Sequence, residues 1–277
     1  MKSKQRFFSR NCLVGAPALA IVSVLAFAFI AFGQTGGTSA AEPGTAKSSK
    51  MPASAGVKLH LTNDPDISGI WTHHPDPAAR PYASCCFADP KITDSLMTPW
   101  ALARFNQNKA GFGPHAVSIG ENDPTIKCEP PGVPRIYMHL FPIQIIQVPG
   151  MVLELFEYDH FVRRIFTDGR GHPKDIEPTW MGDSIGHWEG DTLVVDTVGL
   201  NDKTWIDRDG HPHSDKMHVI ERIHRPSPDT LKIGITVVDP VAYTKPVAGE
   251  MTFQARPDWQ IEEHICEDNV NDTDLEQ

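Results

Sequence analysis

Four histidines lie close together in residues 210–225, whose sequence is GHPHSDKMHVIERIHR. His211, His213 and Asp215 occupy alternate positions of this stretch. In an extended segment, side chains two residues apart point to the same side, so these three side chains could converge. Imidazole nitrogens and a carboxylate oxygen suit zinc or another divalent metal ion. The stretch predicts either a divalent-metal site or a solvated turn that carries surface histidines.

The same region also permits acid–base chemistry without a metal. His213 or His160 is the candidate general base. Arg164 would stabilise a developing anion, and Glu221 or Asp215 would orient the imidazole. These residue types suffice for proton abstraction or hydrolysis, which favours a lyase or a hydrolase. The alternative for Glu221 and Arg164 is a structural ion pair inside the fold.

Three tryptophans form a second group of candidate residues. Trp180, Trp188 and Trp205 each lie near polar, glycine-containing sequence. An indole ring beside polar groups suits a sugar ring or an aromatic ligand, so the three are candidate substrate-binding residues. The alternative is packing in the core and at the rim of the fold. The chain has no glycine-rich phosphate loop, dinucleotide fingerprint or C-x-x-C-H haem motif.

The spacing of apolar residues predicts a mainly β protein. After residue 142, apolar and β-branched runs alternate with turn signals such as Pro149-Gly150. One short helix is expected at 98–111, with Thr98 as N-cap and Pro99 at the first helical position. Nine or ten strands are expected, the candidates being 68–73, 143–148, 152–158, 160–167, 184–189, 192–199, 216–225, 230–239, 250–256 and 259–266.

The connections between these strands indicate the fold class. No long helical pattern alternates with the strands, which disfavours a parallel βαβ arrangement. Successive hairpins that must protect their edges favour an antiparallel up-and-down β-barrel or a strongly curved sheet of lipocalin-like form. We expect an irregular N-terminal segment at 59–132, within a single β-rich domain at 59–267, and an acidic tail at 268–277.

Residues 1–40 have the pattern of a secretory signal peptide. Basic residues precede an apolar run at 13–32, and small residues at 38–40 suit cleavage after Ala40. Because the run is also long enough to span a bilayer, the alternative is an uncleaved inner-membrane anchor. Both interpretations place the rest of the chain outside the cytoplasm, in the periplasm or secreted. Residues 41–58 have linker composition and are expected to be disordered.

The expected mature chain is acidic. Removing the four basic residues of 1–40 from the total of 25 leaves 21 basic against 35 acidic residues, a net charge of −14. An acidic surface argues against nucleic acid or an anionic membrane as partner and leaves a small molecule as the expected ligand. Membrane contact is expected only through an uncleaved N-terminal segment, and no oligomeric state is indicated.

Four cysteines remain after signal removal, an even number that suggests disulfides in an exported protein. Cys128 with Cys266 is the preferred pair, because it would tie an early loop to the last strand. Adjacent cysteines rarely bond to each other. Cys85 and Cys86 are therefore expected to be loop thiols, partners in an intermolecular bond, or metal ligands.

Several phrases of the sequence, among them TPWALARF, CEPPGVPR, DPVAYTKP and the stretch 168–225, resemble a large group of exported bacterial proteins from soil and water organisms that has no settled activity. The resemblance covers about residues 67–266. It implies a single exported β-rich domain and carries over no catalytic residues.

These observations together predict an exported β-barrel enzyme. It would be a lyase or hydrolase that acts on a small organic or carbohydrate-derived substrate by histidine acid–base chemistry. One alternative is a lipocalin-like binding protein for an apolar or aromatic small molecule. Another is a structural envelope protein.

Overall fold

The computed structural model describes residues 59–75, 82, 85–117 and 120–269. All of them belong to one compact unit, which extends from Pro52 to Gln277. The expected signal peptide, the linker at 41–58 and most of the acidic tail lie outside the described residues. Within the described part of the chain, no helix has the length and apolar character needed to cross a membrane.

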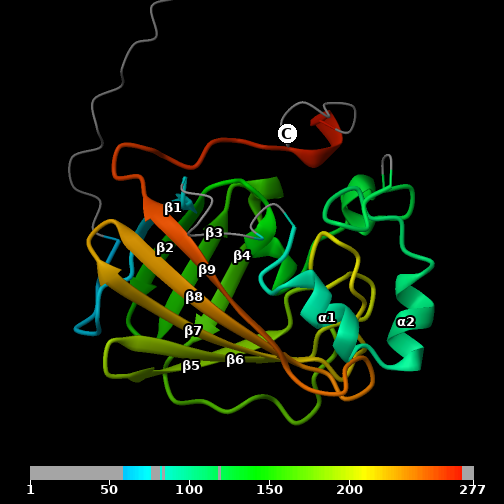
Figure 1. Cartoon of the computed structure of the whole chain (residues 1–277). Coiled ribbons are helices and arrows are strands. Elements are labelled where there is room, and N and C mark those ends of the chain that lie inside the picture. Colours follow the sequence, from blue (N-terminus) through cyan, green and yellow to red (C-terminus); the bar gives the residue numbers. More distant parts are fainter. Residues whose placement is uncertain (1–58, 76–81, 83–84, 118–119, 270–277) are drawn as a thin grey trace, which may run out of the picture. The chain divides into compact units, whose positions relative to one another are not determined.

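The described residues form a closed, mainly β barrel in which each strand pairs with its neighbours in sequence and β9 pairs with β1 (Figure 1). The predicted fold class is therefore confirmed. The strands are β1 (Gly69–His73), β2 (Ile143–Val148), β3 (Met151–Phe156), β4 (Val162–Phe166), β5 (Asp183–Glu189), β6 (Thr192–Val198), β7 (His218–Ser227), β8 (Thr230–Val238) and β9 (Val247–Ala255).

The barrel has one parallel seam, between β4 and β5. The strand directions cannot alternate all the way round a closed ring of the nine strands described. At least one pair of neighbouring strands must therefore be parallel. The seam is short, with Ile165 opposite Ser184 and Phe166 opposite Ile185. Its connection, residues 167–182, contains no helix. The sequence had predicted antiparallel hairpins without this exception.

Alternation along the strands separates the core from the surface. Strand β8 alternates strictly between buried and partly buried residues, and β2 does the same. Most inward-facing side chains, among them Trp71 and Phe253, are apolar, almost fully buried and part of one apolar cluster. Burial of this surface is the main source of the barrel's stability.

Two short helices lie beside one end of the barrel, next to the yellow loop between β6 and β7 (Figure 1). Helix α2 (Pro99–Phe105) begins as predicted, with the Thr98 hydroxyl accepting a hydrogen bond from the backbone of the first turn. It ends well before the predicted stop at Gly111. Helix α1 (Pro90–Leu96) was not predicted, although Asp89 caps it in the same way.

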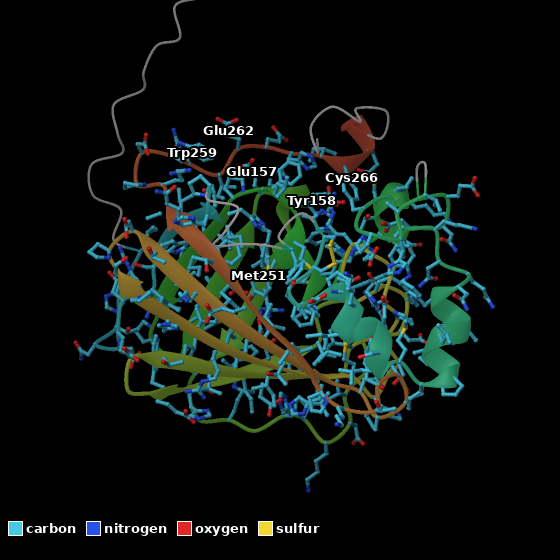
Figure 2. The ribbon with its side chains drawn as sticks, in the orientation of Figure 1. Glu157, Tyr158, Met251, Trp259, Glu262 and Cys266 are labelled. Carbon is cyan, nitrogen blue, oxygen red and sulfur yellow. A yellow bond between two sulfur atoms is a disulfide. The ribbon has the colours of Figure 1, made fainter. Side chains whose placement is uncertain are left out.

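The predicted strand at 259–266 is wrong. This segment has no regular structure until a short 3-10 helix, η5 (Cys266–Asn269). Figure 2 shows Glu262 of this segment above Glu157 at the barrel's end and Cys266 to the right; the backbone N–H of Glu262 donates to the Glu157 carboxylate. The predicted Cys128–Cys266 disulfide is confirmed, with a Cα–Cα distance of 5.5 Å.

Candidate functional site

The first charged cluster fills the middle of the barrel, and Glu221 of β7 belongs to it. The predicted partner of Glu221, Arg164, is wrong: Arg164 lies on the outer face of β4, and Arg163 is the inward residue. The register between β3 and β4 decides this, because it sets Arg163 directly opposite Glu154, another inward residue. Glu221 therefore forms the expected structural ion pair, but with Arg163 in place of the adjacent Arg164.

Arg163 binds groups from four other strands. Its Nη1 donates to Glu221 at 2.9 Å and to Glu154 at 3.1 Å. Its Nη2 donates to the second oxygen of Glu221 and, at 2.8 Å, to the Thr197 hydroxyl. Its Nε donates to the Ser184 hydroxyl at 3.2 Å, across the parallel seam. We call these residues, with Tyr137, the interior network.

The interior network contains two carboxylates and one guanidinium. Burial raises the pKa of Glu154, although the nearby charge of Arg163 acts in the opposite direction. The Tyr137 hydroxyl lies 2.8 Å from both oxygens of Glu154. All these side chains are nearly inaccessible to solvent, so the network connects strands β3 to β7 and is not placed to meet a substrate.

Ser184 also belongs to a sequence match that was missed. Residues 182–186 read GDSIG, which fits the G-x-S-x-G pattern of serine hydrolases. In those enzymes the serine stands on a sharp turn between a strand and a helix. Here Ser184 lies within strand β5, is buried, and bonds to Arg163 and Thr197. The match therefore does not form a nucleophile elbow.

A second charged cluster lies in the loop between β6 and β7, beside helix α1. Asp207 organises the turn: one carboxylate oxygen accepts the backbone N–H groups of Asp209, at 3.0 Å, and His211, at 3.2 Å. Aspartate favours turns because its side chain can bond its own following backbone. Gly210 has φ of 93°, a conformation that glycine adopts without steric cost. The turn directs the His211 ring back toward Asp207.

Two carboxylates hold the His211 ring. Its Nδ1 lies 2.6 Å from Asp207, and its Nε2 lies 3.0 Å from Asp94 of α1. The Phe105 ring stacks on it at 4.7 Å between centroids. Burial by itself lowers the pKa of His211, but the charge and hydrogen bond of Asp207 and the hydrogen bond to Asp94 raise it to about 10. His211 is therefore a fixed cation at neutral pH, not a base.

His115 forms a second pair in the same cluster. Its Nδ1 lies 2.8 Å from Asp209, and its backbone N–H donates to the other Asp209 oxygen at 2.9 Å. Its Nε2 lies 3.5 Å from Asp94. Gly113 permits this approach, because a Cβ there would lie 2.4 Å from an Asp209 oxygen. Asp94, His115, Asp207, Asp209 and His211 are called the rim site below.

The rim site is partly open to solvent. The His115 side chain is 41% exposed and that of Asp94 is 31% exposed, whereas that of Asp209 is inaccessible. The hydrogen bond from His211 lowers the pKa of Asp94, so this carboxylate is charged. Burial raises the pKa of Asp209 despite its hydrogen bonds with His115. A solvent-facing imidazole held by a buried carboxylate is an arrangement suited to general acid–base catalysis.

The residues predicted from sequence as catalytic occupy three separate environments. Glu221 lies in the interior network. His213 is a buried residue of the β6–β7 loop. His160, Arg164 and Asp215 are exposed. The structure does not gather them around one point, and none of them belongs to the rim site.

His213 is chemically distinct from its neighbour two residues earlier. Its Nδ1 lies 3.1 Å from the Ser214 carbonyl oxygen, and its Nε2 has no hydrogen-bond partner in the described part of the chain. Burial lowers the pKa of His213, so the ring is neutral at pH 7. Asp215 points to solvent and pairs with Lys216 at 2.9 Å.

The predicted metal ligands do not converge either. Both nitrogens of His211 bond to aspartates, and Asp215 lies at the surface. No group of three or more histidine, cysteine, aspartate or glutamate side chains among the described residues is arranged to hold a metal ion. The H-x-H-x-D spacing would align its side chains only in an extended segment, and this segment turns.

The three predicted tryptophans also lie apart from one another. Trp205 is buried, with the Arg135 guanidinium 4.9 Å from its ring centre. Trp188 packs against the apolar core. Trp180 is partly buried, with the Lys203 ammonium 5.7 Å from its ring centre. Each ring thus has a packing partner in the fold.

Sequence reasoning missed four of the five rim residues. Residues 207–211 form a D-x-D-G-H run that ends at His211, the first residue of the H-x-H-x-D spacing, and this run is the local signal in the sequence. Asp94 and His115 lie far from it in sequence, in an unpredicted helix and an irregular loop. No protein family model, curated protein or solved structure matches this chain.

Proposed function

We propose that the protein is an enzyme that performs acid–base chemistry at the rim site, with His115 as the general base or acid. The observation that carries the proposal is the Asp209–His115 contact of 2.8 Å, between an inaccessible carboxylate and a solvent-facing ring. A buried carboxylate on Nδ1 fixes the tautomer and leaves Nε2 toward the reacting group. The sequence predicts that role for His213 or His160, of which His213 is buried and His160 is exposed away from the rim site.

The other rim residues position the groups that would exchange protons with a substrate. His211, as a fixed cation between Asp207 and Asp94, holds the Asp94 carboxylate in place. Asp94 faces His115 Nε2 across 3.5 Å, so substrate protons can be exchanged between a carboxylate and an imidazole. This arrangement suits a lyase or a hydrolase acting on a small organic or carbohydrate-derived substrate.

The proposal includes export, as the sequence predicts. The Cys128–Cys266 disulfide supports it, because such bonds persist in oxidising compartments. A lipocalin-like carrier has less support. Its ligand would occupy the barrel, where large side chains such as Trp71 and Phe253 and the interior network pack together.

Paired variants test the catalytic proposal. The purified protein would be screened on aryl esters, aryl glycosides and uronic acid polymers, and His115→Gln and Asp209→Asn compared on any substrate that reacts. General acid–base catalysis contributes about 10²–10⁴-fold, so His115→Gln should lose about that much in kcat with its unfolding midpoint unchanged. The matched control is His187→Gln, a ring on the outer barrel wall that is 67% exposed. Equal activity of His115→Gln and His187→Gln would refute the proposal.

A further inference from the structure

A disulfide between neighbouring cysteines lies next to the rim site. Cys85 and Cys86 are bonded to each other, contrary to the expectation that adjacent cysteines stay unbonded. Both are buried, with 4% and 2% of their surface exposed. Their backbone N–H groups both donate to the Tyr82 carbonyl oxygen. Neither the interior network nor the proposed chemistry uses this bond.

The cysteine pair is connected to the rim site through a backbone hydrogen bond. The carbonyl oxygen of Cys85 accepts the backbone N–H of Arg208 at 2.8 Å. Arg208 lies between Asp207 and Asp209, the two carboxylates that hold the rim imidazoles. The Cys85 carbonyl therefore fixes the middle of the turn on which both Asp–His pairs depend.

A second connection follows the chain itself. Phe87 and Ala88, directly after the pair, lie against the backbone of Gly249, so closely that a Cβ there would lie 1.9 Å from the Phe87 oxygen. Helix α1 begins at Pro90 and carries Asp94 into the rim site. The segment 85–94 thus contacts the rim site at both of its ends, through the Cys85 carbonyl and the Asp94 carboxylate. The peptide at its start, between Cys85 and Cys86, is constrained by the disulfide.

We propose that Cys85–Cys86 is a reversible thiol–disulfide site whose oxidised form holds the rim site in its working geometry. The reductant is a dithiol. One of its thiolates attacks a cysteine sulfur, the Cys85–Cys86 bond breaks, and a mixed disulfide forms. The second thiolate of the reductant then displaces the protein thiolate. Two electrons and two protons pass to the protein, giving two thiols and an oxidised reductant.

Reduction changes the rim site because it releases the peptide between the two cysteines. In the oxidised form the ring closed by the sulfurs restricts the backbone dihedrals of this peptide. In the reduced form the Cys85 carbonyl can rotate away from Arg208. The turn at 207–211 then loses its hydrogen bond to Cys85. His211 would then be held less closely between its aspartates.

The first experiment establishes the bond. The protein is alkylated with iodoacetamide in denaturant without reductant, and the tryptic peptide containing Cys85 and Cys86 is weighed. The expected result is an unalkylated peptide that takes up two alkyl groups only after dithiothreitol treatment. Alkylation of both cysteines without reductant would overturn the proposal.

The second experiment measures the effect on the rim site. It uses the variant Cys128→Ser/Cys266→Ser, so that dithiothreitol can reduce only the adjacent pair among the cysteines of the barrel unit. NMR follows the His211 imidazole, whose pKa of about 10 reports on its aspartates. Reduction should lower that pKa by about 1 or more, and reoxidation should restore it.

An unchanged His211 pKa in the fully reduced protein would overturn the proposal. The double variant Cys85→Ser/Cys86→Ser gives the same comparison without a reductant and should match the reduced form. Since the measured group is an imidazole proton, the result does not depend on whether the rim site is catalytic.

Discussion

The interior network and the rim site are built from the same chemical groups at different depths. Each combines carboxylates with a cation, Arg163 in one and His211 in the other. In the interior every member is inaccessible, whereas the rim site opens to solvent at Asp94 and His115. Burial turns the first into a structural connection between strands. Partial exposure leaves the second able to exchange protons with a bound molecule.

The largest expected effect is in the interior network. Arg163→Ala leaves Glu221 without its cation inside the barrel, and breaking a buried pair by removing one partner costs about 3–5 kcal/mol. Urea unfolding of the two proteins would measure this difference. The matched control is Arg164→Ala, an exposed neighbour on the same strand, which should change the free energy of unfolding by less than about 0.5 kcal/mol. Equal effects of the two variants would show that the interior ion pair is not needed.

The next largest effect is at the rim site and depends on pH. The pKa of His211 is raised from 6.5 to about 10, so its stabilising contribution is fully present below pH 6.5 and is lost as the pH rises toward 10. A tenfold change in proton affinity is worth about 1.4 kcal/mol, so the rise from 6.5 to about 10 gives an upper bound of about 5 kcal/mol. His211→Gln should therefore flatten the dependence of unfolding free energy on pH between these values. An identical pH profile in both proteins would contradict the assignment of His211 as a cation.

The smallest effect separates the two interior carboxylates. Burial raises the pKa of Glu154, which weakens the preference for its charged form, and Arg163 donates to only one of its oxygens, so Glu154→Gln should cost about 1 kcal/mol. Glu221→Gln removes the charge that meets Arg163 at both oxygens and should cost clearly more. Chemical unfolding of both variants at pH 7 gives the ranking. A larger loss of unfolding free energy in Glu154→Gln than in Glu221→Gln would show that Glu154, not Glu221, is the main charge partner of Arg163.

Local patterns predicted most of the barrel because the strands alternate in sequence as they do in space. The segments 143–148 and 192–199 matched β2 and β6 to within a residue. The phase of β4 could not be predicted, since VRR places a charge on either face. Only the pairing of Arg163 with Glu154 on β3 selects the inward arginine.

The rim site was less predictable for a different physical reason. The stretch around His211 was identified as a candidate, but its partners Asp94 and His115 come from segments about 100 residues earlier. Asp89 and Pro90 do form a helix-start signal, which was obscured by the proline-rich sequence before it. Nothing local indicates that α1 packs against the β6–β7 loop, since tertiary contacts create that approach.

The closure of the barrel by β1 and β9 has a consequence for folding. Trp71 of β1 must pair with Ala255 of β9, so the ring cannot close until almost the whole barrel sequence has been synthesised. Pairing over such long separations is slow, and an open ring exposes two unpaired edges that invite aggregation. Until the ring closes, we expect Arg163, Glu154 and Glu221 to remain hydrated, because only the complete barrel buries them. We expect these charges, which are costly to bury in the closed barrel, to favour solubility of the open one.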